Sequence, residues 1–387
     1  MKRVAVLYSG GRQWGGIETY LANLLRLHDP TQIYPVLVSL GEWELTRALE
    51  QNGLASLVRI LSSKRMRLRT VFDIRRMITT EHLGLVVSHG TVANAYARLA
   101  ALLAHVPSLV VVHSDMTLDY PRSKRLAYVL SDRALRAATT RYVAVSHDLK
   151  EKLVKSGIKA ERVNVIYNGV GVAGGIPRRA LATATKSVAG QGAGRPAARA
   201  DERSEATTML ASVGRLHPVK NFDGLIKAML VLPGNVYLTI WGDGPEKARL
   251  AALIEKLGLG DRVVLAGESQ NMEEALEGVA VYVQPSKSEG WGFTVGEAML
   301  HGMPVVVTPR GGLPEQVDHG VTGVVAEDCS PEALAKAIMS LVADPERATR
   351  LGAAGREAAE AKFPMQKWLR DTTSVFCDTA RGDASPQ

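Results

Sequence analysis

Short apolar segments alternate with helical stretches along this chain, and the series runs through twice. In the first half the apolar runs are Val4–Leu7, Tyr34–Leu40, Leu85–Ser88, Leu109–Val112, Tyr142–Val145 and Val163–Tyr167. In the second half they are Met209–Val213, Val236–Trp241, Val263–Ala266, Val279–Gln284 and Pro304–Thr308. Runs that are apolar throughout are typical of parallel strands covered by helices on both faces. The sequence therefore predicts an α/β protein with two doubly wound, Rossmann-like domains.

The two series are separated by a stretch of different composition. Residues 171–208 are rich in Ala, Gly, Arg and Ser and have little apolar periodicity, which is typical of a linker. We therefore predict an N-terminal domain at 1–170, a flexible linker at 171–208 and a C-terminal domain at 209–365. Residues 366–387 are predicted to form a C-terminal helix and tail, and one option for this helix is a return to the N-terminal domain.

Composition excludes several protein classes. The chain has 387 residues, of which 46% are hydrophobic and 22% charged, the usual balance of a globular protein. Its two cysteines, Cys329 and Cys377, are too few for a disulfide framework. No apolar run approaches the roughly 18–20 residues of a spanning helix, and the apolar run after Met1 is too short for a signal peptide. A cytoplasmic enzyme is therefore expected.

Charge is distributed unevenly between the two halves. Residues 1–168 carry a net charge of +11, whereas residues 209–387 carry −6. A basic face attracts nucleic acid, an anionic membrane surface or a phosphorylated substrate. Arginines on solvated helices would give the same net charge without any such partner. Aromatic residues are only 5% of the chain and no nucleic-acid recognition motif is present, so no nucleic-acid partner is predicted.

Two cations follow the first strand of the second half. Gly214 and Arg215 come directly after that strand, and Lys220 follows five residues later. Ligands of open α/β sheets bind at the carboxyl ends of the strands, and a pair of cations there suits a diphosphate. The alternative is an ordinary surface Arg and Lys beside the start of a helix.

Two glutamates stand in and after a glycine-rich loop further along the chain. Glu289 lies directly after a predicted strand, and a carboxylate in such a loop is suited to accept hydrogen bonds from sugar hydroxyls. Glu297 lies eight residues on, in a predicted helix whose N-terminus would favour an anion. A structural alternative exists for Glu297, because Thr294-x-x-Glu297 also matches a capping box.

Taken together, these motifs resemble the retaining glycosyltransferases of family 4, which have the two-domain GT-B fold. In the second half the matching residues are Gly214-Arg-Leu with Lys220-Asn221, Gly242-Asp-Gly-Pro245, Ser286-x-x-Glu289-Gly-Trp-Gly, the Glu289/Glu297 pair with seven residues between its members, and Gly311-Gly312 with Glu315. In the first half they are Gly15-Gly16-x-Glu18, His113, Val145-Ser146 and Asn168-Gly169-Val170. The family often has an acid after Asn-Gly-Val, where this chain has Gly171.

The resemblance implies a role for each matching position. Arg215 and Lys220 would neutralise the donor diphosphate, Glu289 would contact the donor sugar and Glu297 the ribose. His113 would contact the sugar from the first domain, although a strand-end histidine with a purely structural role looks the same. The implied catalytic residues are His113, Glu289, Arg215 and Lys220. The implied binding residues are, for the donor, Gly15, Gly16, Arg215, Lys220, Glu289, Gly290, Trp291, Gly292 and Glu297, and for the acceptor, Glu18.

The function implied is transfer of a sugar, with retention, from a UDP- or GDP-sugar to a hydroxyl of a lipid-linked or polysaccharide glycan. No cofactor and no metal are expected. A small soluble acceptor is an alternative, as are an epimerase, a phosphorylase or a non-catalytic nucleotide-sugar binding protein. Residues 64–77 interleave basic and apolar residues and could lie on an anionic membrane surface at the inner face, or form a solvated amphipathic helix.

Overall fold

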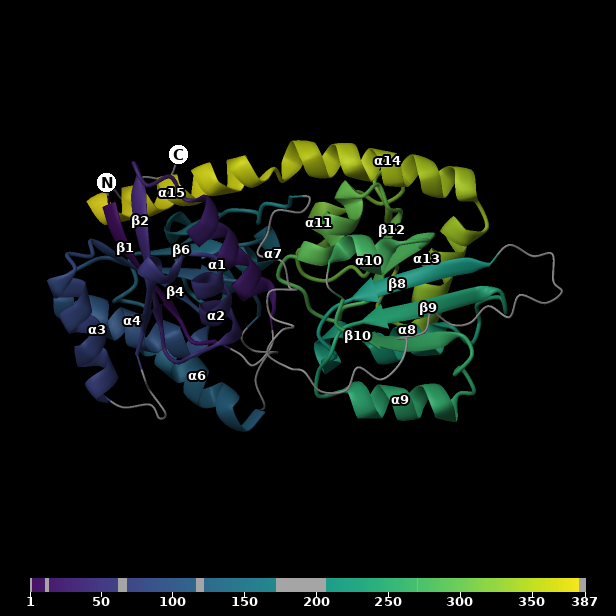
Figure 1. The fold of residues 1–387 in the computed structure, drawn as a ribbon, viewed down its shortest axis with the longest axis horizontal. Coiled ribbons are helices and arrows are strands. Elements are labelled where there is room, and N and C mark those ends of the chain that lie inside the picture. Colours follow the sequence, from purple (N-terminus) through teal and green to yellow (C-terminus); the bar gives the residue numbers. More distant parts are fainter. Residues whose placement is uncertain are drawn as a thin grey trace. The chain divides into compact units, whose positions relative to one another are not determined.

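The computed structural model describes residues 2–10, 14–61, 68–115, 122–171, 207–269 and 271–382, which form two compact units (Figure 1). The N-terminal unit runs to Gly169 and also includes the last helix, from Met365 onward. The C-terminal unit includes Val170 and runs to Pro364. Most of the predicted linker, and the end of the predicted tail, lie outside the described residues.

A parallel sheet in the order β3-β2-β1-β4-β5-β6-β7 forms the centre of the N-terminal unit. Its strands are β1 (Lys2–Tyr8), β2 (Ile33–Ser39), β3 (Val58–Ile60), β4 (Leu85–His89), β5 (Ser108–Val112), β6 (Arg141–Ala144) and β7 (Val163–Val165). Its helices are α1 (Gly16–Leu27), α2 (Glu44–Gln51), α3 (Leu68–Thr80), α4 (Thr91–Ala104), α6 (Arg122–Ala134), α7 (His147–Lys155) and α15 (Met365–Arg381). The strand order reverses between β1 and β4, so the switch point of the fold lies between Tyr8 and His89.

The C-terminal unit is built around a second parallel sheet, in the order β10-β9-β8-β11-β12-β13. Its strands are β8 (Thr208–Val213), β9 (Val236–Trp241), β10 (Val263–Gly267), β11 (Val281–Gln284), β12 (Val305–Val307) and β13 (Val324–Val325). Its helices are α8 (Phe222–Ala228), α9 (Lys247–Lys256), α10 (Met272–Leu276), α11 (Phe293–Leu300), α12 (Leu313–Gln316), α13 (Pro331–Val342) and α14 (Pro345–Lys362). Here the strand order reverses between β8 and β11.

Burial explains why the strands can be predicted from the sequence. The central strands are apolar on both faces, and Val4–Leu7 and Val305–Val307 are completely buried. Every strand predicted from the sequence is present. The strands β3 and β13 were not predicted, because they are only two or three residues long and lie at sheet edges.

Two helices make packing contacts that the apolar pattern of the sequence does not reveal. The buried positions of α14 include Ala348, Gly352, Gly355 and Ala359. This stripe of small residues allows α14 to pack closely against α11. Because the residues are small, they do not stand out as an apolar pattern in the sequence. Helix α15 packs against β1, β4 and β5 through Trp368, Phe376 and several threonines. Within the described ranges, no helix is both long enough and apolar enough to cross a membrane.

Candidate functional site

An ion pair joins the two loops at the switch point of the C-terminal sheet. Lys220 ends a short 3-10 turn (Pro218–Lys220) after β8, and Glu289 lies in the loop after β11. The Lys220 Nζ atom lies 2.5 Å from Glu289 Oε2, and the exposed fractions of the two side chains are 20% and 15%. Although the residues are 69 apart in sequence, adjacent parallel strands bring their loops to the same edge.

Arg215 lies in the same loop as Lys220 but differs in its contacts. The Arg215 side chain is exposed, and it makes no hydrogen bond or ion pair with any residue that the structure describes. The guanidinium adds a positive charge beside a Lys–Glu pair whose own charges balance. Its planar fork can donate two parallel hydrogen bonds to phosphate oxygens.

A series of side-chain hydrogen bonds, which starts at a buried tyrosine of β11, ends at the Glu289 carboxylate. The Tyr282 hydroxyl donates to Gln284 Oε1 (2.8 Å), Gln284 Nε2 donates to Ser286 Oγ (2.9 Å), and Ser286 Oγ donates to Glu289 Oε2 (3.1 Å). The side chains of residues 282, 284 and 286 share one face because they alternate along β11 and its extension. Burial raises the pKa of the Tyr282 hydroxyl, which keeps it a neutral donor. This series of hydrogen bonds therefore orients the Glu289 carboxylate before any ligand binds.

Helix α11 begins differently from the sequence expectation. Its N-cap is Gly292 and has no side-chain cap, so the capping-box interpretation of Thr294 and Glu297 is wrong. The Thr294 hydroxyl instead donates to Gln284 Oε1 (3.2 Å) and joins the series of hydrogen bonds that ends at Glu289. Glu297 lies half-buried one turn into α11. Its predicted contact with ribose stays a prediction.

The backbone of Glu289 is held by a close approach that requires glycine. Gly311 has a φ of +60°, and a Cβ atom added there would lie 1.7 Å from the Glu289 carbonyl oxygen. The neighbouring Gly312 N–H donates to that same carbonyl (3.0 Å). Trp291, two residues beyond Glu289, is buried against Phe363, with ring centroids 4.9 Å apart. The donor loop predicted at 289–292 is therefore anchored on both sides.

The Gly242-Asp-Gly244 turn supports the loop that carries Arg215. A Cβ atom at Gly242 would lie 1.9 Å from the Gly214 carbonyl oxygen, and one at Gly244 would lie 2.4 Å from the Leu216 carbonyl oxygen. In return, Leu216 N–H donates to the Asp243 carbonyl (2.8 Å). The geometry of this turn is thus explained by backbone packing between the loops after β8 and β9.

In the N-terminal unit, Glu18 supports the Gly15-Gly16 loop. Gly15 is the N-cap of α1, and its N–H donates to Glu18 Oε2 (2.9 Å). The other carboxylate oxygen, Oε1, accepts a hydrogen bond from the Tyr8 hydroxyl at the end of β1. Both oxygens of this buried carboxylate are therefore used within the unit. The predicted contact of Glu18 with an acceptor stays a prediction.

His113 lies just after β5, and its ring is paired with a histidine that the sequence did not single out. His113 Nε2 lies 2.8 Å from Nδ1 of His89, the last residue of β4. Burial lowers the pKa of His113 to about 3 and lowers the pKa of His89 well below its ordinary value. Both rings are therefore neutral at physiological pH. His89 could have been found as a polar residue ending an apolar strand next to the switch point.

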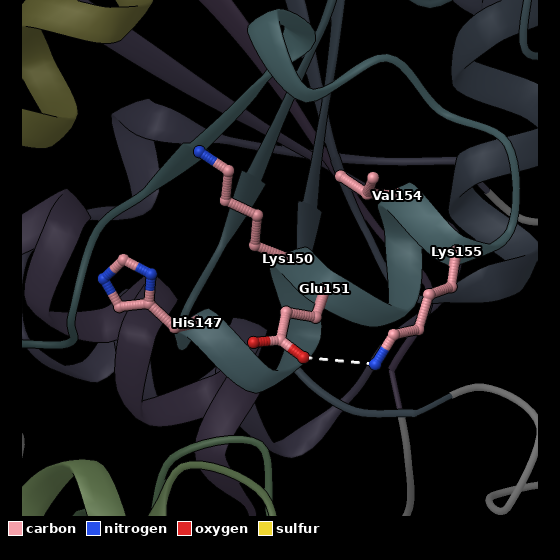
Figure 2. A pocket seen from close by; sticks show the side chains of 5 residues that line it. All are labelled: His147, Lys150, Glu151, Val154 and Lys155. Atoms are coloured by element: carbon pink, nitrogen blue, oxygen red, sulfur yellow. Dashed lines mark hydrogen bonds and ion pairs between the residues drawn. The ribbon is translucent and has the colours of Figure 1, made fainter.

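A hollow of about 280 Å³ lies along α7 (Figure 2). It is lined by His147, Lys150, Glu151, Val154 and Lys155, which share one face of the helix, and an ion pair of 3.2 Å joins Glu151 to Lys155. None of these residues belongs to the predicted site. The predicted residues divide between the two units: Gly15, Gly16, Glu18 and His113 lie in the N-terminal unit, and the others in the C-terminal unit.

Two family profiles match the chain, one in each half. Residues 14–173 match the profile described as Glycosyltransferase Family 4, and residues 195–358 match the profile described as Glycosyl transferases group 1. Together the two matches take in most of the sequence. The chain belongs to the group 1 glycosyltransferases. The GT-B fold class predicted from the sequence, with two Rossmann-like domains, is confirmed.

Curated relatives of this family differ in what their names say they act on. One is a GDP-mannose-dependent alpha-(1-6)-phosphatidylinositol monomannoside mannosyltransferase of Mycobacterium tuberculosis, 34% identical over 49% of this chain and 52% of the relative. Another is the alpha-maltose-1-phosphate synthase of Mycolicibacterium smegmatis, 26% identical over 79% of this chain and 81% of the relative. The chain spans about half the length of the curated relatives that it matches first.

Among solved structures, HepE from Anabaena in complex with UDP-glucose resembles this chain over nearly its whole length. The TM-score is 0.79 with 19% sequence identity, and the match covers 97% of this chain and 99% of HepE. At this identity the likeness shows a common fold.

Proposed function

We propose that this chain is a retaining glycosyltransferase that moves a sugar from a UDP- or GDP-sugar to a hydroxyl group of a lipid-linked or polysaccharide glycan. The observation that carries the proposal is the Lys220–Glu289 pair at the C-terminal switch point, with Arg215, which has no partner among the described residues, in the same loop. The cations suit a diphosphate, and the oriented carboxylate suits sugar hydroxyls. Relatives that use GDP-mannose, or are solved with UDP-glucose, support a nucleotide-sugar donor.

The proposed chemistry follows from where charge develops. The bond between the anomeric carbon and the β-phosphate oxygen breaks, and the electron pair leaves with the nucleoside diphosphate. Arg215 and Lys220 would stabilise this negative charge, and we propose that they do so without a metal ion. The acceptor oxygen forms its bond to the anomeric carbon on the same face, and its proton passes to the departing phosphate oxygen.

Ligand-dependent thermal unfolding in EDTA tests the donor site. A nucleoside diphosphate at about 100 times its Kd should stabilise the protein by about 2.7 kcal/mol. We expect UDP or GDP to raise the Tm, and ADP and NAD to leave it unchanged. If neither UDP nor GDP shifts the Tm, the donor site is not where the ion pair predicts it.

Product analysis then separates the alternative activities. With the sugar form of the stabilising nucleotide and a glycolipid acceptor, the proposed enzyme yields a glycoside with the anomeric configuration of the donor. An epimerase would release an isomeric nucleotide sugar, a phosphorylase would need inorganic phosphate, and a binding protein would give no product. A small soluble acceptor would be recognised by transfer in the absence of lipid.

A lipid-linked acceptor is favoured by one surface of the N-terminal unit. Helices α3 and α6 both pack against α4 (Figure 1). Exposed apolar side chains occur on all three helices, namely Leu68, Phe72, Leu102, Leu103, Leu126 and Leu130. On α3, Leu68 is 79% and Phe72 57% exposed, beside three exposed arginines, Arg69, Arg75 and Arg76. We propose that this surface rests on an anionic membrane at its cytoplasmic face, where each cation contributes about 1 kcal/mol. Residues 64–67 of the predicted membrane segment lie outside the described residues.

Flotation with phosphatidylserine vesicles tests the membrane proposal. Wild-type protein is expected to float with the vesicles, and the double variant Leu68→Ser/Phe72→Ser to remain in the soluble fraction. The matched control is Leu230→Ser/Val231→Ser, because these two side chains are similarly exposed on the C-terminal unit. A wild type that stays in the soluble fraction, or equal flotation of both double variants, would contradict the proposal.

A further inference from the structure

The histidine pair of the N-terminal unit constrains where its protons lie. His89 is fully buried at the end of β4, whereas His113 is only partly buried. The hydrogen bond between His89 Nδ1 and His113 Nε2 is 2.8 Å long. Two neutral imidazoles carry one proton each, so only one of these two nitrogens can be the donor.

The surroundings of His89 decide between the two arrangements. Its other nitrogen, Nε2, is buried and has no hydrogen-bond partner among the described residues. If His113 Nε2 donated, His89 Nε2 would have to carry a proton and would be a buried N–H without an acceptor. Such orphaned donors are rarer in proteins than unpaired acceptors. The favoured arrangement places the proton on His89 Nδ1 and leaves a lone pair on Nε2.

The neighbouring rings support the same choice. Tyr20 of α1 packs against both histidines, with ring centroids 5.1 Å from His89 and 5.0 Å from His113, and Trp368 of α15 packs edge-on against Tyr20 at 4.9 Å. Trp368 Nε1 is itself a buried donor without a hydrogen-bond partner in the described structure. A protonated His89 Nε2 would add a second unpaired donor to this cluster.

We infer that His89 is a positioning residue that donates to His113 Nε2 and thereby holds His113 in the tautomer protonated at Nδ1. The Nδ1 atom of His113 has no partner in the described residues and is not among the buried polar atoms, so it can reach a ligand. His113 thus presents a fixed N–H donor to an oxygen atom and does not serve as a proton acceptor. That the oxygen is a hydroxyl of the donor sugar rests on the proposed function.

The packing around the pair explains why this arrangement is rigid. Tyr20 contacts both histidines and Trp368, and Trp368 brings α15 to the cluster from the far end of the sequence. Rings packed on this face limit rotation of both imidazoles, and the backbone of β4 fixes the position of His89. The tautomer is therefore set by tertiary contacts and does not require the ligand to be bound.

Two-bond ¹⁵N–¹H correlation spectra of histidine-labelled protein test the inference, because they distinguish the two neutral tautomers and the imidazolium. At pH 7.5 we expect both His89 and His113 to be neutral and protonated at Nδ1. A His113 that is charged, or protonated at Nε2, overturns the inference. This measurement is made on wild-type protein, so it does not depend on whether a variant folds.

Two variants test the effect on the reaction. The His89→Asn amide can replace the Nδ1 donor, and we expect it to preserve the His113 tautomer and to keep kcat/KM within about threefold. The His89→Leu side chain cannot donate, so His113 should become a mixture of tautomers and kcat/KM should fall about tenfold, the effect of one lost hydrogen bond. If both variants lose stability equally and the His113 tautomer does not change, His89 is only structural.

The outcomes separate this inference from the proposed function. If His113 is protonated at Nδ1 but the protein transfers no sugar, the tautomer stands and the proposed function fails. If the protein is an active transferase but His113 is protonated at Nε2, the inference fails and the function stands.

Discussion

Replacing Lys220 with alanine is expected to lower kcat/KM for the nucleotide-sugar donor by about 100- to 1000-fold, the usual effect of removing one group that stabilises developing charge. The variant should also lose the rise in Tm that UDP or GDP produces in wild-type protein. Removing the ammonium has a second consequence, because the Glu289 side chain, 15% exposed, loses the cation that it is paired with. We expect the loss of one positive charge at this edge to weaken its attraction for a diphosphate.

The matched control is Lys336→Ala. Lys336 Nζ also lies 2.5 Å from a glutamate, Glu327, but the exposed fractions of these side chains are 74% and 72%. An exposed pair of this kind contributes about 0–1 kcal/mol, so this variant should retain the wild-type Tm, donor response and kcat/KM. Equal losses in the two lysine variants, or an unchanged kcat/KM in Lys220→Ala, would remove Lys220 from the donor site.

Replacing Gly311 with alanine is expected to reduce the free energy of unfolding by about 3 kcal/mol or more, since it combines a left-handed backbone with a steric clash. The new Cβ would lie 1.7 Å from the Glu289 carbonyl oxygen, so the loop that holds Glu289 would have to move. Donor binding should therefore weaken together with stability. Urea unfolding followed by tryptophan fluorescence measures the first effect, because Trp291 is buried in the same loop.

Gly320→Ala separates the clash from the backbone conformation. Gly320 has a φ of +75°, close to that of Gly311, but a Cβ atom there would have no neighbour within 4 Å. This variant should cost about 1 kcal/mol, the ordinary cost of a side chain in the left-handed region. If the two glycine variants are equally destabilised, contact between Gly311 and Glu289 is not what holds the loop.

The candidate site was predicted in part from the sequence, for a reason that follows from the fold class. In a doubly wound sheet, residues that come directly after strands gather at one edge, so Arg215, Lys220 and Glu289 could be selected from strand ends alone. Which of these loops are neighbours depends on strand order. The pairing of Lys220 with Glu289 exists because β8 and β11 are adjacent, although two strands separate them in sequence.

Supporting residues were harder to predict. Gln284 and Ser286 are polar residues at the end of an apolar strand, and their role in holding Glu289 is visible only through the hydrogen bonds beneath it. Thr294 matched a local capping pattern, but its hydroxyl bonds to Gln284, because a tertiary partner replaced the local one. His89 likewise became significant only when β4 and β5 placed it beside His113.

The sequence by itself determined the two α/β series, nearly all of their strands and the strand-end residues suited to a nucleotide sugar, because apolar runs and their adjacent loops are local properties of the chain. Only the tertiary structure decided that α15 packs with the first series, that Glu18 braces the Gly15 loop, and that His89 accompanies His113. These contacts join residues through packing and hydrogen bonds whose partners are set by the order of strands in the sheet. Neither a residue's type nor its spacing encodes that order directly.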